Sequence, residues 1–214
     1  MRNRAWARLP VRVEHRLERL DPLLRWLAVD GYGFHQGYFH WQRFINGQTR
    51  PRLRGYALRA VDQGLGRSVW FVNGASAEQI VETMSAFDEN RRSDLWSGVG
   101  LACGYAGGVS GTTIEKLKVS AGVNLPEFAQ GVAFATKARE RAGNPSPFNE
   151  LACRLVWGQT ASDVARRTDS ALIDLPPDQR VPAYEVWRQR VQSQFTLCLR
   201  DQQAAVIHST EEVA

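Results

Sequence analysis

Two segments of the chain, about 67 residues apart, share the same spacing of glycines. Residues 31–38 have glycine at their first, third and seventh positions, and so have residues 98–105. The first segment is accompanied by Asp30, His35 and His40, whereas the second has neither an acid nor a histidine at the matching positions. Glycine allows another backbone to approach closely. The shared glycines therefore predict a packing scaffold, and the additional polar residues predict chemistry.

The correspondence between the two segments extends beyond the glycines. At the same offset, residues 63–65 (Gln-Gly-Leu) match residues 130–132 (Gln-Gly-Val), and Gly55 matches Gly122. A weaker third copy is predicted to begin at Leu151. We interpret the pattern as a helical-pair repeat in which neighbouring pairs stack and share one core. The alternative is a chance match between glycine-rich helices.

Helix start and stop signals are dense along the chain, and strand signals are nearly absent. Asp21 followed by proline predicts a helix start, and a second helix is predicted over residues 55–72. Capping boxes are predicted at Ser76, Thr112 and Thr160. The sequence therefore predicts an all-α fold of eight or nine helices in stacked αα repeats. We expect a basic N-terminal helical segment (1–20), one helical-repeat domain (21–200) and a tail (201–214).

Composition and charge limit the classes of protein to consider. The 214 residues are 43% apolar and 23% charged, as in ordinary soluble domains. Charged residues interrupt every long apolar stretch and the N-terminus, so neither a membrane-spanning helix nor a signal peptide is predicted, and a cytoplasmic location is expected. The basic N-terminal segment is a candidate for peripheral membrane contact, with solvent or a protein surface as the alternative. No nucleic-acid recognition module accompanies its arginines.

Signatures of metal and cofactor sites are missing from the sequence. The three cysteines lie far apart and are expected to be small buried residues. His35 and His40 would point about 140° apart on a regular helix, so they cannot bind one metal ion together. No dinucleotide fingerprint, phosphate loop or nucleophile elbow is found. We therefore expect neither a metal nor a cofactor.

Asp62 and Asp30 are the acids best suited to chemistry. Asp62 projects from the edge of an apolar helix face, where a carboxylate must be paired or must face a cavity. Arg59, one turn earlier, would pair with Asp62 in a purely structural role. His35 is a candidate general acid or base, with a hydrogen-bonded structural role as the alternative.

Aromatic residues crowd the helix that carries the first set of glycines. Rings on all sides of a helix predict a core element or the wall of a cavity. Such a cavity would suit a flat or conjugated apolar small molecule. Arg67, on the helix predicted over residues 55–72, points elsewhere than Asp62 and could meet an anion or another helix. The candidate substrate-binding residues are Tyr32, Phe34, Tyr38, Trp41, Gln63 and Arg67.

Six long stretches of the chain also support a family comparison. They are residues 26–40, 62–72, 92–102, 129–139, 150–154 and 184–187. These stretches resemble a bacterial family of unknown function whose members accompany enediyne polyketide gene clusters. The resemblance implies a role in making or maturing an enediyne or related polyene product, without an established activity or catalytic residues. Members of that family carry a further helical half before the position of Trp6, so the chain is expected to be a shortened member or a C-terminal piece.

Two functions from different classes are consistent with these features. In the first, the protein is a cofactor-independent enzyme acting on a conjugated polyketide intermediate. Asp62 and His35 would be its acid and base, Asp30 a further catalytic group, and the aromatic residues would enclose the substrate. In the second, it is a non-catalytic helical scaffold or carrier that binds a biosynthetic partner protein or an unstable intermediate.

Overall fold

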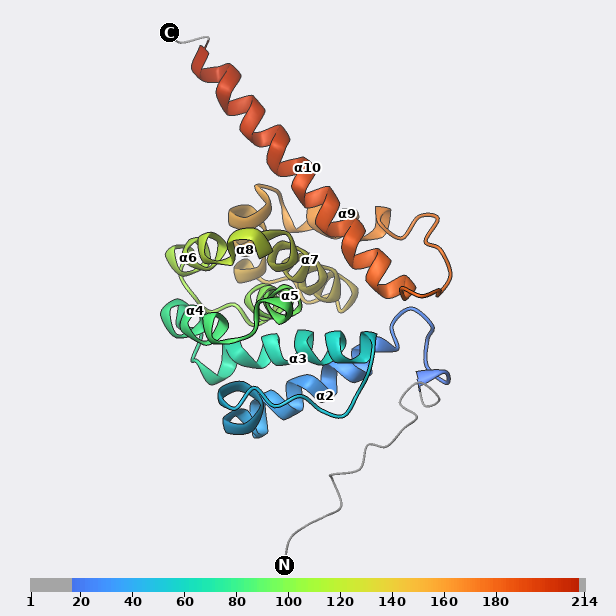
Figure 1. Cartoon of the computed structure of the whole chain (residues 1–214). Coiled ribbons are helices and arrows are strands. Elements are labelled where there is room, and N and C mark those ends of the chain that lie inside the picture. Colours follow the sequence, from blue (N-terminus) through green and yellow to red (C-terminus); the bar gives the residue numbers. More distant parts are fainter. Residues whose placement is uncertain (1–16, 212–214) are drawn as a thin grey trace, which may run out of the picture.

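The part of the chain that the structure describes, residues 17–211, consists of helices and their connections (Figure 1). In this computed structural model, residues 17–211 form nine α-helices and no strand, which confirms the predicted all-α fold. None of these helices is sufficiently long and apolar to cross a membrane. The helices are α2 (Trp26–Phe39), α3 (Tyr56–Val72), α4 (Ala77–Ala86), α5 (Glu89–Ala106), α6 (Gly111–Ala121), α7 (Leu125–Arg141), α8 (Pro147–Trp157), α9 (Ala161–Ser170) and α10 (Ala183–Glu211). A π-helical turn (Gln42–Asn46) follows α2, and a 3-10 turn (Gly122–Asn124) precedes α7.

Four long helices, α2, α3, α5 and α7, stack side by side as an inner row. Gly33 of α2 lies against Val61 of α3, and Gly37 lies against Ser68, so residue numbers rise together and the two helices run parallel. The α3–α5 and α5–α7 pairs repeat this arrangement. The shorter helices α4, α6 and α8 pack against one another as an outer row. The protein is therefore a stack of helical layers, each with one inner helix.

Glycines at matching positions make the close approach of the inner helices possible. A Cβ atom added to Gly64 would overlap with the Asp30 carbonyl oxygen, and one added to Gly98 would overlap with that of Gln63. The first three inner helices also carry a second glycine facing the next layer, such as Gly66 against Leu95. Because the obstructing atoms belong to the backbone, they cannot rotate away. Only glycine fits at these positions.

The layer repeat is half as long as the offset found in the sequence. The first glycine of each inner helix is residue 31, 64, 98 or 131, which gives steps of 33, 34 and 33 residues. An offset of 67 therefore spans two layers. The stacked helical repeat itself is present, but Leu151, the expected start of a third copy, lies on α8 in the outer row rather than on an inner helix.

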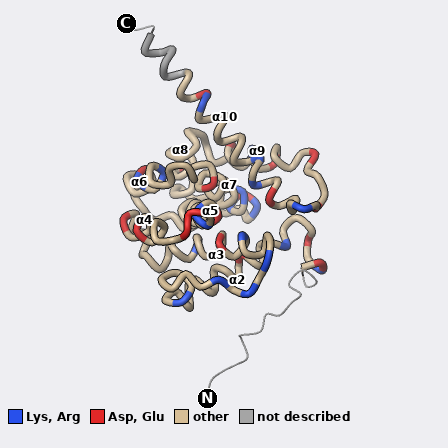
Figure 2. Tube along the Cα trace, in the orientation of Figure 1, with Lys and Arg blue, Asp and Glu red and all other residues tan. Residues whose placement is uncertain are grey.

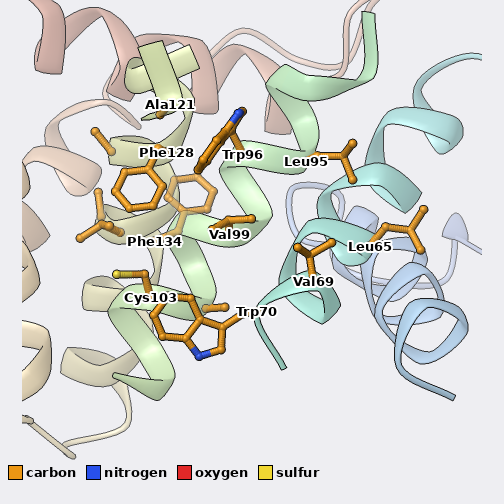
Figure 3. Packing of buried hydrophobic residues seen from close by; sticks show 14 of the residues in the cluster. Leu65, Val69, Trp70, Leu95, Trp96, Val99, Cys103, Ala121, Phe128 and Phe134 are labelled. Carbon is orange, nitrogen blue, oxygen red and sulfur yellow. The ribbon is translucent and has the colours of Figure 1, made fainter. Parts of the chain in front are cut away.

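The core lies between the inner helices (Figure 3). Leu65 and Val69 of α3 are fully buried and are followed along the stack by Leu95 and Val99 of α5. Phe128 of α7 continues the same core. Layers inside the stack, such as α3 and α5, thus bury their apolar side chains against neighbours on both sides, as expected for a stacked repeat.

Local signals placed most helix ends correctly. Ser76 Oγ accepts the Gln79 amide N–H at 3.4 Å, and Thr160 Oγ1 accepts the Asp163 amide N–H at 3.0 Å. The predicted cap at Thr112 is wrong, because Thr112 already lies inside α6 and Ser110 accepts the first free amide instead. The chain between the predicted start at Asp21 and the start of α2 at Trp26 forms turns rather than a regular helix.

The last helix, α10, packs across α7, α8 and α9 and continues beyond them (Figure 1). It runs without interruption through the predicted domain limit at residue 200. Most of the basic N-terminal segment proposed as a membrane contact, residues 1–16, lies outside the described residues. Two features of the fold are candidates for a functional role. One is the interface of α10 with α7, α8 and α9, and the other is the outer face of α2 at the other end of the stack.

Candidate functional site

The layer register places one polar residue of each inner helix at the same position. The residue directly before the first glycine is Asp30, Gln63, Ser97 or Gln130 in successive layers, and all four are buried. Ser97 Oγ donates to Gln130 Oε1 at 2.9 Å, and Gln63 Nε2 donates to Asp94 Oδ1 at 3.0 Å. We call these four residues the buried polar row.

Arg188 of α10 connects this row to the last helix. Its side chain is 1% exposed and donates to Asp94 Oδ1 at 3.0 Å, to Glu185 Oε2 at 2.6 Å and to Gln130 Oε1 at 3.1 Å. Arg59 contacts the same two acids from α3, at 2.8 Å and 2.9 Å. Burial opposes the charge of Asp94, but Arg188 and Arg59 outweigh it and hold the pKa of Asp94 below its usual value. Two arginines therefore balance two carboxylates in a structural clamp.

Asp62 is also held in a buried ion pair, although not with the expected partner. Arg91 of α5 donates to both carboxylate oxygens of Asp62, at 2.6 Å and 3.0 Å, and its remaining nitrogen donates to the Gln48 carbonyl oxygen. The predicted pairing with Arg59 is wrong, because Arg59 points into the clamp instead. With Arg91 1% exposed, this ion pair is a buried link between the layers of α3 and α5.

Asp30, the first residue of the buried polar row, forms an ion pair. Its partner is Arg67 of α3. Arg67 was expected to meet an anion or another helix, and it contacts an acid of the neighbouring helix α2. The Arg67 guanidinium also lies 5.0 Å from the centre of the Phe34 ring. Burial raises the pKa of Asp30 to about 6, although Arg67 opposes this shift. Asp30 is thus the predicted catalytic residue with the most perturbed acidity.

His35 lies apart from both acids. It is exposed on the outer face of α2, with its ring 4.9 Å from Phe39 and 6.0 Å from His40. The two histidines come closer than a regular helix predicts because α2 ends at Phe39 and His40 has a non-helical backbone. No group of three or more metal-ligating side chains occurs within residues 17–211. The structure therefore does not bring His35 and Asp62 together.

The predicted substrate-binding residues are divided between the core and the surface. Gln63 is buried and Tyr32 is half-buried against the core. Tyr38 and Trp41 are exposed, and Phe34 is half-buried beside them. Two surface depressions in the described part of the chain, one along α9 and one between α4 and α6, are lined by none of these residues. The predicted residues do not enclose a common cavity.

Two of these residues, Phe34 and Tyr38, instead belong to an aromatic cluster at the free end of the stack. The rings of Phe34 and Tyr38 stack at 5.8 Å, and Phe71 of α3 meets them edge-on at 5.7 Å and 6.2 Å. Phe39 adds a fourth ring and is 63% exposed. Asp30, which is buried, is the single charged residue of α2, so the outer face of this helix carries none (Figure 2). An apolar surface without charges is typical of a binding site.

The chain matches one family of known proteins. The model of a family described as "Protein of unknown function (DUF1702)" matches residues 4–195, which is most of the chain. The chain belongs to the DUF1702 family. No curated protein and no solved structure matches it. The description of the DUF1702 family names no activity. We therefore infer the roles of individual residues from the structure.

Three residues of the clamp, all within the DUF1702 match, were missed from the sequence. They are Asp94, Glu185 and Arg188. The residues before the first glycine of each layer would have been recognised as one row from a repeat of about 33 residues. No comparable signal identifies Arg188, because it acts from α10, outside the repeated inner helices.

Proposed function

We propose that this protein is a non-catalytic helical scaffold that binds a partner protein through the outer face of α2. The exposed apolar side chains on this face carry the proposal. Leu27 and Tyr38 of α2 are 42% and 43% exposed, Phe39 is 63% exposed, and Leu24, in the turn that leads into α2, is 43% exposed. Contiguous exposed apolar surface of this kind favours association, because its burial removes it from water.

The positions of the predicted acids and base favour binding over catalysis. Asp62 is buried and paired on both oxygens, and His35 faces outward on a different helix. A general acid and base must reach the same substrate within hydrogen-bonding distance. The site therefore supports the scaffold hypothesis better than the enzyme hypothesis.

We further propose that the scaffold takes part in the biosynthesis or maturation of an enediyne or related polyene polyketide. This part of the proposal rests on the sequence resemblance of residues 26–40 and 62–72 to proteins that accompany such gene clusters. The buried polar row then serves to hold the layers in register, so that the α2 face keeps its shape.

Genetic complementation tests both parts of the proposal. The gene is deleted in the strain that carries it, and variants are returned at equal protein levels while the polyene product is quantified by mass spectrometry. A variant with Tyr38→Ser and Phe39→Ser should fail to restore the product, since it removes exposed rings without entering the core. Ile173→Ser, which changes an equally exposed apolar residue after the end of α9, is the matched control and should restore it.

His35→Asn separates the two hypotheses. It keeps a polar side chain on the α2 face but cannot transfer a proton near neutral pH, so a scaffold should tolerate it. Loss of product with His35→Asn, together with full activity of the Tyr38/Phe39 variant, would support the enzyme hypothesis instead. An unchanged product level after deletion of the gene would exclude the proposed pathway.

A further inference from the structure

Gly31 differs from the three glycines that match it. In the inner helices that follow, the first glycine lies directly against the backbone of the preceding layer. Gly64 lies against the backbone of Asp30 and Phe34, Gly98 against that of Gln63 and Arg67, and Gly131 against that of Ser97 and Leu101. A Cβ atom on Gly31 would meet nothing within 4 Å among residues 17–211. The first inner helix thus has the glycine required for close packing, but none of the described helices packs on it.

The neighbours of Gly31 on the helix surface show the same difference. Ala28 is exposed, whereas the residues at its position in the next three layers, Val61, Leu95 and Phe128, are each 0% exposed. His35 is exposed, whereas its equivalents Ser68, Ala102 and Ala135 are at most 3% exposed. The outer face of α2 therefore has the register of a buried layer interface along its length.

The three existing interfaces define what would fit on this face. In each of them the preceding helix runs parallel to the next and places a glycine against its backbone, namely Gly33 on Val61, Gly66 on Leu95 and Gly100 on Phe128. Terminal layers of stacked repeats usually have a polar outer face. The outer face of α2 lacks charge and exposes leucine and aromatic side chains.

We propose that a helix of another polypeptide docks on the outer face of α2 as a further inner layer, parallel to α2. Its packing face carries a glycine that lies over Ala28, and its backbone lies over Gly31. This inference rests on the proposed scaffold function and names the kind of partner. Within the described layers, Gly33, Gly66 and Gly100 are already occupied. Residues 1–16 contain no glycine and carry Pro10, so their sequence lacks the required face.

A peptide from the chain itself serves as the probe. Residues 88–107 cover α5 and carry Gly100 and Gly104, the glycines that face α7 in the folded protein. The acetylated, amidated and fluorescently labelled peptide is titrated with the full-length protein and followed by anisotropy. Saturable binding is expected. It should weaken by about tenfold or more with the Gly31→Leu protein, because leucine fills the space at the centre of the interface.

Two matched controls accompany this titration. Val119→Leu on α6 enlarges an exposed apolar side chain away from α2 and should leave binding unchanged. A peptide with Gly100→Leu should bind about tenfold more weakly or worse to the wild-type protein. Circular dichroism should show that Gly31→Leu is folded, because its side chain enters open space.

The other outcomes overturn either the docking proposal or the proposed function, and the two failures can be told apart. Absence of saturable binding to the wild-type protein, or equal binding to Gly31→Leu, would exclude a layer-like helix on this face. A mass by light scattering of twice the monomer, abolished by Gly31→Leu, would show that a second copy of the chain covers α2. If the peptide does not bind but the Tyr38/Phe39 variant still loses the product, the scaffold function stands without this type of partner. If the peptide binds through Gly31 but the Tyr38/Phe39 variant still restores the product, the docking proposal stands and the proposed function fails.

Discussion

Alanine substitutions at two matched glycines should change stability in opposite directions. Gly31 and Gly64 occupy the same position in successive inner helices, but a Cβ atom on Gly31 would meet no atom of the described part of the chain within 4 Å. On Gly64 it would lie 2.6 Å from the Phe34 nitrogen and 2.8 Å from the Asp30 carbonyl carbon. Real Cβ atoms essentially never approach other atoms within 3.0 Å. The first position tolerates alanine and the second excludes it.

Two contributions to the free energy of folding set the magnitude. Replacing glycine by alanine inside a helix favours folding by about 1 kcal/mol at either position. At Gly64 the layers must also move apart, since backbone atoms cannot rotate away, and overpacking of this kind costs about 3 kcal/mol. We therefore expect Gly31→Ala to stabilise the protein by about 1 kcal/mol and Gly64→Ala to destabilise it by about 2 kcal/mol. In a chain of this length, Tm should rise by about 2–4 °C and fall by about 4–8 °C, respectively.

Thermal unfolding followed by far-UV circular dichroism, with urea titration as a second measurement, tests this expectation. Gly98→Ala is the matched replicate, because its Cβ would lie 2.6 Å from the Arg67 nitrogen. A Gly64→Ala protein as stable as the wild type, or shifts of Tm in the same direction for Gly31→Ala and Gly64→Ala, would refute the steric explanation of the glycine pattern.

Three further predictions concern buried ionisable groups. Because burial raises the pKa of Asp30 from its ordinary value of 3.8 to about 6, the folded protein keeps this proton after the unfolded chain has lost it. The stability of the wild type relative to Asp30→Asn should therefore fall by about 2–3 kcal/mol between about pH 4 and about pH 6 and stay level above, as measured by urea unfolding. Asp62→Ala and Arg91→Met should each cost about 3–5 kcal/mol, while the double variant should cost less than their sum in a double-mutant cycle. Burial raises the pKa of both Cys103 and Cys153 to about 12, so a disulfide reagent should label them only as the protein unfolds.

Each of these predictions has a contradicting result. A difference in stability between wild type and Asp30→Asn that stays constant with pH would show that Asp30 ionises normally in the folded protein. Additive costs of the Asp62 and Arg91 substitutions would mean that the two charges do not interact. Rapid labelling of Cys103 in the native protein would place its thiol at the surface.

Local features of the fold were predictable from the sequence. The limits of α3, predicted as residues 55–72 and observed as Tyr56–Val72, depend on nearby glycines and on Asn73. The caps at Ser76 and Thr160 depend on amides three residues away. Interactions within a few residues of chain are recorded directly in the sequence pattern.

The partners of the predicted site residues were less predictable. Asp62 could pair with Arg59 on its own helix, and only the stacking of α3 on α5 makes Arg91 the better partner. Aromatic residues on all sides of α2 predicted a core or a cavity, but α2 is the end layer and exposes one side. The repeat was found at twice its true length because alternate layers share the most obvious glycines. In each case the missing information is which layers lie next to each other.

The clamp formed by Arg188 also determines when the fold can be completed during synthesis. Asp94 leaves the ribosome 94 residues before the arginine that contacts it, and Tyr56 leaves 129 residues before its hydrogen-bond partner Glu185. At translation rates of about 5–20 residues per second, Asp94 waits roughly 5–20 s for Arg188. The early layers can stack as they emerge, since their glycines meet without α10. During that interval the ribosome has synthesised Arg59 but not Arg188, so only one arginine of the clamp is present. A nascent chain that ends before residue 188 should therefore be the form most exposed to misfolding and proteolysis.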